Sequence, residues 1–269
     1  MKMNHAILAC LPCLLAASLL AQPQIVGVGG PCNSSTLNGT YSLTLSGRDV
    51  SSAVSFSNVV QGVGTATFDG QSKATFTLTD NTNAASGQAL TWSGTYSLQA
   101  NCTGVLNITT GNSASFTLGS YDGGVDFFID GQDGTYSYLG GGNTQPTQTC
   151  AVSTLNGTYS FSGNGFAVSS GSITGVNQIS GLMVFNGTGG VTTTWVLSVA
   201  GSSTTNTTSG TYSVATGCTA SANITDPSGN AYTLGLTITG VNGGTLLGTN
   251  FAFNSSSPKL IFSGNGRTL

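Results

Sequence analysis

The chain has 269 residues and a formal net charge of −3, and only 5% of its residues are charged although 38% are hydrophobic. Disordered chains combine low hydrophobicity with high net charge, so this composition favours a folded protein. The shortage of lysine and arginine argues against a nucleic-acid partner, because phosphate binding needs a basic surface. The 40 glycines follow no Gly-X-Y period, which excludes collagen, and turns account for them.

The N-terminus has the pattern of a secretory signal peptide over residues 1–21. Lys2 precedes an almost uninterrupted apolar run from Ala6 to Leu20. This run is too short to cross a membrane as a helix, and no second run occurs. We therefore expect no membrane span and a secreted, extracellular or periplasmic location. Cys10 loosely resembles a lipoprotein site, but it lies inside the apolar run and not at its end, which disfavours lipidation.

The rest of the sequence is a tandem duplication. Cys32–Ser42 (Cys-Asn-Ser-Ser-Thr-Leu-Asn-Gly-Thr-Tyr-Ser) returns as Cys150–Ser160, and Ser93–Ser97 (Ser-Gly-Thr-Tyr-Ser) returns as Ser209–Ser213. The offset is nearly constant, so the repeated unit is a whole domain. Composition then predicts a flexible lead-in, two domains with a small mutual interface, and a linker containing Gly, Pro and Thr. These are 22–31 for the lead-in, 32–139 for the first domain, 140–149 for the linker and 150–269 for the second domain.

Each half shows strand patterns and no helical periodicity. Tyr41–Leu45 and Thr75–Thr79 alternate apolar and polar residues, which is typical of strands with one buried and one solvated face. The spacing of turn residues predicts an all-β protein of two tandem antiparallel β-barrels, or sandwich-like domains, of about eight strands each. A closed barrel is favoured, because these weakly charged strands have few residues that would protect an open edge.

Two hairpins are predicted at matching places in the halves. Asp69-Gly70 and Asn186-Gly187 each lie between two alternating runs. Such dipeptides favour type I′ turns, which need a positive φ at both central residues.

The four cysteines beyond the signal peptide are interpreted as two structural disulfides. Cys32 and Cys102 lie in the first half, and Cys150 and Cys218 lie in the second. Of the three possible connectivities, the duplication favours Cys32–Cys102 and Cys150–Cys218, since an exported chain meets an oxidising compartment. A four-thiolate zinc site is disfavoured because no Cys-x2-Cys spacing occurs. Closing a loop of this length stabilises each domain by ~4 kcal/mol.

Side chains that could perform catalysis are scarce. His5 is the only histidine and lies in the signal peptide, and the chain has no glutamate. Ser-His-Asp and Cys-His arrangements are thereby excluded, as are the common zinc sites that use histidine. We expect no catalytic residue, no cofactor and no enzymatic activity.

One acidic cluster occurs in the first half only: Asp122, Asp126, Asp130 and Asp133 lie in a glycine-rich stretch. We interpret it as a solvated turn region. The main alternative is a calcium site, since carboxylate oxygens around glycine turns suit this ion, although the EF-hand pattern is absent. A catalytic pair for glycoside hydrolysis is the least favoured interpretation.

The recurrence of aromatic residues bears on whether they serve structure or ligand binding. Trp92 and Trp195 occur once per half but at non-equivalent positions, so core packing is favoured over carbohydrate stacking. Some tyrosines do recur, in the Gly-Thr-Tyr-Ser motifs, and their recurrence is expected equally of a binding role and of structural corners in which the hydroxyl bonds to the backbone. These pairs are Tyr41 with Tyr159 and Tyr96 with Tyr212.

The repeated motifs resemble modules of secreted bacterial proteins. The resemblance rests on Leu37–Ser42 (Leu-Asn-Gly-Thr-Tyr-Ser), Ser93–Ser97 and Asn101–Gly104 (Asn-Cys-Thr-Gly) and spans both halves, although Ala220 replaces the last glycine in the second half. Such modules are associated with small β-barrels similar in outline to allene oxide cyclase and lipocalin-like barrels. The resemblance implies a fold and carries over no catalytic residue.

These observations predict a secreted or cell-surface protein with a structural, adhesive or small-ligand-binding role and no catalytic activity. Its partner would be a cell surface or a small molecule. The alternative is a barrel enzyme that acts on a small apolar or carbohydrate substrate. The barrel interior discriminates between them, because an open cavity with converging polar groups favours ligand binding or catalysis, and a filled interior favours a scaffold.

Overall fold

The computed structural model describes residues 31–50, 58–199, 201–242, 247–257 and 260–269. The predicted signal peptide and residues 22–30 of the lead-in lie outside these ranges. Within them, no helix is both long and apolar enough to cross a membrane.

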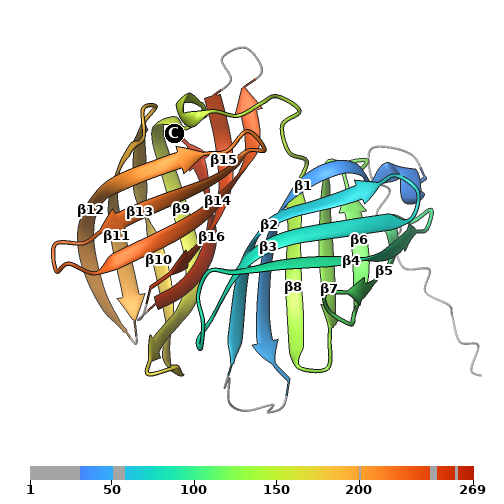
Figure 1. The fold of residues 1–269 in the computed structure, drawn as a ribbon, viewed down its shortest axis with the longest axis horizontal. Coiled ribbons are helices and arrows are strands. Elements are labelled where there is room, and N and C mark those ends of the chain that lie inside the picture. The colour runs from blue at the N-terminus through green and yellow to red at the C-terminus, as the bar shows by residue number, and fades with distance from the viewer. Residues whose placement is uncertain (1–30, 51–57, 200, 243–246, 258–259) are drawn as a thin grey trace, which may run out of the picture.

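The first half forms a closed antiparallel barrel, in which each strand pairs with the next and β8 returns to β1 (Figure 1). A short 3-10 helix, η1 (Ser34–Thr36), precedes it. The strands are β1 (Asn38–Asp49), β2 (Val59–Asp69), β3 (Lys73–Thr82), β4 (Gln88–Leu98), β5 (Thr103–Thr110), β6 (Ala114–Tyr121), β7 (Asp126–Gln132) and β8 (Tyr136–Asn143).

The second half repeats this architecture, with β9 closing the barrel between β10 and β16. It begins with η2 (Val152–Thr154). The strands are β9 (Asn156–Ser169), β10 (Ser172–Asn186), β11 (Gly190–Val199), β12 (Ser202–Val214), β13 (Thr219–Thr225), β14 (Ala231–Asn242), β15 (Leu247–Ser256) and β16 (Leu260–Thr268). The predicted all-β fold of two eight-stranded antiparallel barrels is confirmed, in its closed form.

The first barrel extends further along the chain than the sequence predicted. The sequence places residues 140–143 in a linker, but they belong to β8, where all four pair with β7 and Gly140 and Gly141 also pair with β1. A Cβ at Gly142 would lie 1.7 Å from the carbonyl oxygen of Ser42. The glycines here permit close packing of the closing strand rather than flexibility, so the predicted boundary after residue 139 is wrong.

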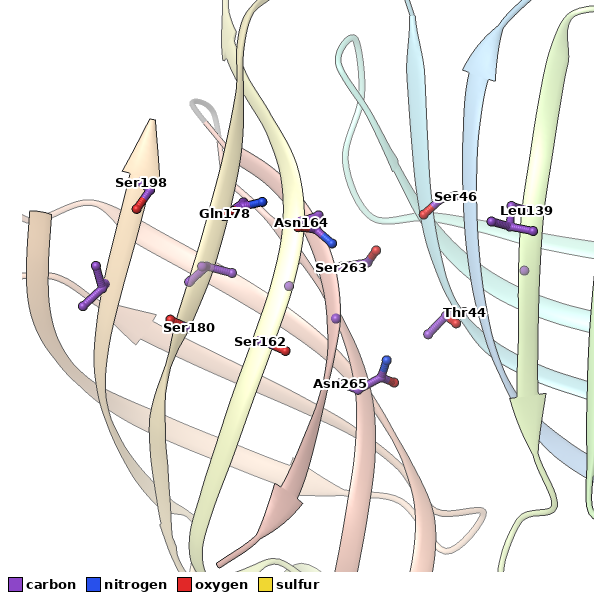
Figure 2. Close-up of a pocket in the computed structure, with 15 residues that line it drawn as sticks. Thr44, Ser46, Leu139, Ser162, Asn164, Gln178, Ser180, Ser198, Ser263 and Asn265 are labelled. Atoms are coloured by element: carbon purple, nitrogen blue, oxygen red, sulfur yellow. The ribbon is translucent and has the colours of Figure 1, made fainter. Parts of the chain in front are cut away.

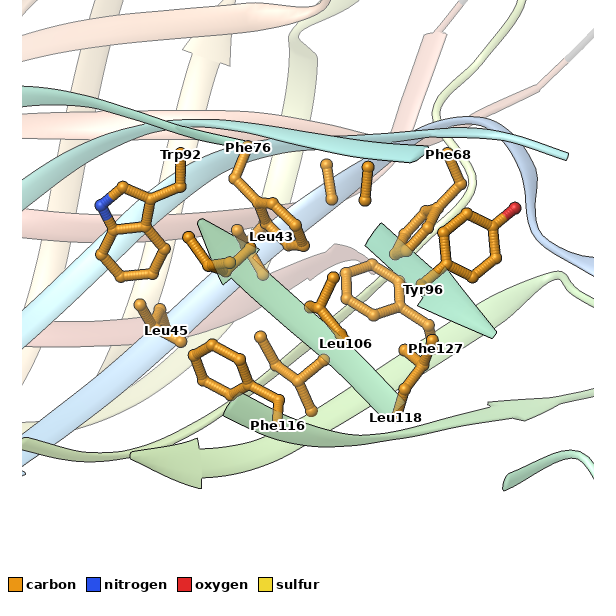
Figure 3. Close-up of a cluster of buried hydrophobic side chains, with 14 of the residues drawn as sticks. Leu43, Leu45, Phe68, Phe76, Trp92, Tyr96, Leu106, Phe116, Leu118 and Phe127 are labelled. Carbon is orange, nitrogen blue, oxygen red and sulfur yellow. The ribbon is translucent and has the colours of Figure 1, made fainter. Parts of the chain in front are cut away.

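Both barrels are filled with apolar side chains. In the first, these come from every strand and include Leu43, Leu45, Phe68, Phe76, Trp92, Tyr96, Leu106, Phe116, Leu118 and Phe127 (Figure 3). In the second, they include Tyr159, Phe185, Trp195, Tyr212, Phe251, Phe253 and Phe262. The indoles of Trp92 and Trp195 are only 4% and 3% exposed, as the prediction of core packing requires. A cavity of about 10 Å³ remains in the second core, roughly the space of one water molecule.

Each barrel has a cysteine pair at disulfide distance near its first strand. Cys32 and Cys102 have Cα atoms 4.9 Å apart, and Cys150 and Cys218 have Cα atoms 5.0 Å apart. These are the pairings that the duplication favours. Each ties the segment before the barrel to the turn after its fourth strand.

The tyrosines of the repeated motifs form structural corners. The Tyr41 hydroxyl donates to the carbonyl of Gly124 at 2.7 Å, and the Tyr159 hydroxyl donates to that of Gly248 at 2.7 Å. Tyr96 donates to the carbonyl of Leu37 at 2.8 Å, and burial raises its pKa to about 12. Tyr212 repeats this contact on Leu155 at 2.6 Å. The motif therefore recurs because it anchors the start of each barrel.

The glycine of Ser-Gly-Thr-Tyr-Ser is required by close packing. A Cβ at Gly94 would lie 1.9 Å from the carbonyl oxygen of Asn107, and one at Gly210 would lie 1.9 Å from that of Asn223. Real Cβ atoms do not approach so closely, so any other residue would move the neighbouring strand. The motif thus records a strand contact, and no chemistry is needed to explain it.

The two predicted hairpins are present, but their turns are not of type I′. Gly70 and Gly187 have φ of 72° and 74°, whereas Asp69 and Asn186 do not adopt positive φ. Instead, Asp69 accepts hydrogen bonds on Oδ1 from the backbone amides of residues 71, 72 and 73, at 2.8 to 2.9 Å. Asn186 accepts two in the same way. The side chain thus organises a longer turn, in which Gly70 alone has positive φ in the first hairpin and Gly187 and Gly189 have it in the second.

The barrels lie side by side and pack through the outer faces of β1, β2 and β3 against β14, β15 and β16 (Figure 1). Asn254, which is 1% exposed, donates from Nδ2 to the carbonyls of Gln61 and Thr79, at 3.2 and 2.8 Å. The Thr237 hydroxyl donates to the carbonyl of Gly64 at 3.2 Å. These contacts satisfy buried polar groups across the interface.

A second part of the interface is apolar. Val59 of the first barrel and Val168 and Ile261 of the second form a buried cluster. Beside it, the Asn83 amide donates to the carbonyl of Gly171 at 2.6 Å. The barrels are thus joined by buried polar and apolar contacts, because Ser/Thr-rich outer faces that suit solvent also suit close packing when their hydrogen bonds are satisfied. The small size of the mutual interface stays a prediction.

Candidate functional site: the cleft between the barrels

A cleft of about 600 Å³ opens between the two barrels (Figure 2). We call it the inter-barrel cleft. Side chains alternate along a strand, and those that line the cleft point outward from their barrels except Ile179, which is buried in the second core. From β1 and β8 these residues are Thr44, Ser46, Leu139 and Gly140; from β9, β10, β11 and β16 they are Ser162, Gly163, Asn164, Gln178, Ile179, Ser180, Val196, Ser198, Ser263, Gly264 and Asn265.

The polar groups of the cleft are neutral, and its amides are unused, whereas the hydroxyls of Thr44, Ser46, Ser198 and Ser263 already take part in hydrogen bonds within the protein. Its side chains carry hydroxyls and amides, and among the described residues none that lines it is charged. The amides of Asn164, Gln178 and Asn265 are exposed and form no hydrogen bond with the described parts of the chain. Because an amide donates two hydrogen bonds and accepts two, these groups are available to a ligand.

The two walls of the cleft are joined by Gln61. Its side chain is buried, and its Oε1 accepts a hydrogen bond from the Ser46 hydroxyl at 2.8 Å and another from the Ser263 hydroxyl. Ser46 belongs to the first barrel and Ser263 to the second, so one amide oxygen fixes both walls. The cleft is therefore preformed, which reduces the ordering cost of binding.

Two further cavities continue the cleft. One of about 720 Å³ shares Ser162 and Asn265 with it, and one of about 220 Å³ shares Thr44 and Asn265. Charged side chains appear only here: Arg267 lines the larger cavity and Asp126 the smaller. The three hollows therefore adjoin one another at Asn265, and we call them together the extended groove.

The four aspartates predicted as a weak calcium site do not come together. Asp122 lies in the turn before β7, and Asp126 begins β7. Asp130 is exposed on the outer face of this strand, and Asp133 follows its far end. Seven residues of extended strand separate the two ends by roughly 20 Å. In the described parts of the chain, no group of three acidic, histidine or cysteine side chains is placed to hold a metal ion.

Asp133 has a structural role. Its Oδ1 accepts from the backbone amides of Thr135 and Tyr136, and its Oδ2 accepts from Asn112 and the Tyr138 hydroxyl, at 2.7 to 3.0 Å. Burial alone would raise the pKa of Asp133, but these hydrogen bonds outweigh it and hold the pKa below its ordinary value. The carboxylate organises the turn between β7 and β8.

Asp126 differs from Asp133 in lacking partners. Its Oδ1 is buried with no hydrogen-bond partner among the described residues. Burial, followed by the nearby Asp122 charge, raises the pKa of Asp126. Asp126 is therefore the one aspartate of the four that lines a cavity, at one end of the extended groove.

One ionisable residue was missed by the sequence analysis. Asp80 points into the first barrel, is 6% exposed, and has an Oδ1 without a partner in the described chain. Burial raises its pKa above the ordinary value. The alternation of β3 carried the signal, because Phe76, Leu78 and Asp80 share one face. The matching position of the second barrel holds Leu197.

No protein-family model matches the chain, and no curated protein matches it. Among solved structures, it is similar to the isotype 1 transferrin binding protein B from serogroup B Neisseria meningitidis. That similarity has a TM-score of 0.29 and 9% identity, and it covers 89% of this chain and 78% of the other. A likeness at this level says nothing about the ligand of this chain. Fold and cleft together define a two-barrel protein with filled interiors and a polar cleft on the outside.

Proposed function

We propose that this chain is a secreted or cell-surface binding protein that holds its ligand in the inter-barrel cleft and performs no catalysis. The observation that carries the proposal is the cleft itself, a preformed hollow of about 600 Å³ lined by hydroxyls and by three amides that form no hydrogen bond with the described chain. Ligand sites are concave and present a few polar groups that fix orientation. Two cysteine pairs at disulfide distance fit an oxidising, extracytoplasmic compartment.

The filled interiors support this role over that of a barrel enzyme. Lipocalin-like barrels hold ligands inside, but the second core leaves about 10 Å³, and the first is packed by aromatic and aliphatic side chains. Two aspartates, Asp80 and Asp126, each have a buried carboxylate oxygen without a partner among the described residues. Asp80 points into the first barrel, whereas Asp126 lies at the end of the extended groove outside it. Acid–base catalysis by a pair of carboxylates needs both at one substrate.

The experiment compares two matched variants of the exported protein. Ser162→Trp places a large side chain in the cleft, and Ser97→Trp places the same side chain on an exposed position of β4 away from it. A library of small molecules, peptides and oligosaccharides is screened by ligand-observed NMR. Ligands of the wild-type protein should be lost with Ser162→Trp and kept with Ser97→Trp. Ligands that survive Ser162→Trp would place binding elsewhere and overturn the proposal.

A further inference from the structure

The chemistry of the cleft indicates what class of ligand it takes. Its polar side chains are hydroxyls and amides, each of which both donates and accepts hydrogen bonds. A ligand that matches them carries closely spaced groups with the same dual character. Sugar hydroxyls have this property, whereas carboxylates, phosphates and ammonium groups do not.

Charged ligands find no partner in the inter-barrel cleft. Among its described lining residues there is no lysine, arginine, aspartate or glutamate. Charge-assisted pairs normally fix anionic or cationic groups in a binding site. The charged side chains Arg267 and Asp126 line the two adjoining cavities, where a longer ligand would meet one cation and one carboxylate.

An extended peptide has no strand to pair with. Every described strand of both barrels is paired on both sides, so the cleft offers no open edge. Peptides that bind sheets by strand addition depend on such an edge. The exposed apolar side chains in the cleft are Leu139 and Val196, from opposite walls, and these do not form a pocket for an apolar anchor.

One end of the extended groove presents an aromatic side chain. Tyr121 lines the 220 Å³ cavity and is 47% exposed. Its ring stacks on Phe128 with centroids 5.1 Å apart and planes inclined by 26°. One face of Tyr121 is thus supported by Phe128, and the opposite face is left for a flat apolar partner such as the C–H face of a sugar ring.

We propose that the extended groove binds a neutral polysaccharide chain. Asn164, Gln178 and Asn265 contact the hydroxyls of this chain, and Tyr121 stacks on a sugar ring at the end of the groove. This inference rests on the proposed function and names its ligand class. Asn265 is central because it lines all three hollows.

The test titrates the full exported chain with neutral tetra- to hexasaccharides of the glucose, xylose, mannose and galactose series, and with oligogalacturonate as the anionic contrast. Calorimetry and saturation-transfer NMR report binding. At least one neutral series should bind, and Asn265→Ala and Tyr121→Ala should each weaken it by about tenfold, equivalent to ~1.4 kcal/mol. Asn107→Ala, which removes an exposed amide on β5, should leave the affinity unchanged.

Two outcomes would overturn the inference in distinguishable ways. Neutral binding that ignores both cleft variants, or tighter binding of oligogalacturonate, would reject the assigned contacts or the ligand class. If no oligosaccharide binds but other ligands remain sensitive to Ser162→Trp, the carbohydrate inference fails while the proposed function stands. If no ligand is sensitive to Ser162→Trp, both fail.

Discussion

The two barrels fill the same layer of their cores with different side chains. In the first, β3 and β4 contribute Phe76 opposite Trp92. In the second, the matching strands contribute Thr193 opposite Thr208, whose hydroxyls bond to each other. The volume lost there is restored one step along β11, where Trp195 occupies the position that Leu78 has in the first barrel. Each core thus holds one indole, and the duplicated halves have diverged by exchanging large and small residues within a layer.

Buried polar groups without partners show the same divergence. The first barrel has Asp80 where the second has Leu197, and the second has Asn177 where the first has Val60. Asp80 Oδ1 and both amide atoms of Asn177 lack hydrogen-bond partners in the described chain. Each half therefore shows, at the matching position, an apolar side chain that the fold accepts. Comparing the two halves thus indicates which buried polar side chains lower the stability of their barrel.

The largest effect should come from breaking the aromatic layer of one barrel. Trp92→Thr removes the indole and should destabilise the first barrel by about 3–5 kcal/mol, as for other large-to-small core changes. Adding Leu78→Trp and Phe76→Thr imports the layer of the second barrel and should recover most of this loss. Urea unfolding of the three proteins checks it. A triple variant no more stable than Trp92→Thr would show that the layers are not interchangeable.

A smaller effect is expected when the barrels are uncoupled. Asn254→Ala removes two hydrogen bonds to the first barrel and leaves buried carbonyls without that donor, at a cost of about 1–3 kcal/mol. Calorimetry should show one unfolding transition in the wild-type protein and two in the variant. Asn223→Ala, on the outer face of β13, is the matched control and should keep one transition. Two transitions already present in the wild-type protein would contradict strong coupling.

The pH dependence of stability should separate Asp80 from Asp133. Because burial raises the pKa of Asp80, its protonated form is favoured in the folded state, and stability falls as pH rises from 3.8 through the raised pKa. Asp133 has a lowered pKa, so its contribution is lost as pH falls below 3.8. Asp80→Leu should therefore abolish the decline above 3.8 and stabilise the protein by on the order of 1 kcal/mol at neutral pH. Unfolding free energies measured across pH decide it. A variant that keeps the wild-type slope would show that another group titrates.

The smallest effect concerns calcium. Asp122 and Asp126 lie at one end of β7 and Asp133 at the other. Added calcium or chelator should therefore leave the melting temperature of the chain unchanged, since an ion bound only by the folded state would raise it. Replacement of Asp122, Asp126, Asp130 and Asp133 by Asn should not alter the response to calcium. A calcium-dependent shift that this replacement abolishes would restore the metal site.

The sequence predicted those features that depend on local patterns or on the duplication. Alternation along each strand predicted the barrels, and one cysteine pair in each half predicted the two bridges. The recurrence of Tyr41 and Tyr96 in the second half left a binding role and a structural corner open, and the structure shows the corner. The predicted start of the linker was wrong because glycines suit close packing of strands as well as flexible linkers, and Gly140–Gly142 are packed closely. The cleft could not be predicted, since Asn164 and Gln178 look like ordinary solvated strand residues until a second barrel is placed beside them.

The contacts between the barrels have a consequence for how this protein can change over time. Asn254 and Thr237 dock on the carbonyl oxygens of Gln61, Thr79 and Gly64, which are groups of the main chain. Every residue type presents such an oxygen, so substitutions on the outer faces of β2 and β3 leave these acceptors in place. These three contacts between the barrels therefore do not depend on which side chains the first barrel carries there, whereas the alignment of the cleft walls also depends on the Gln61 side chain.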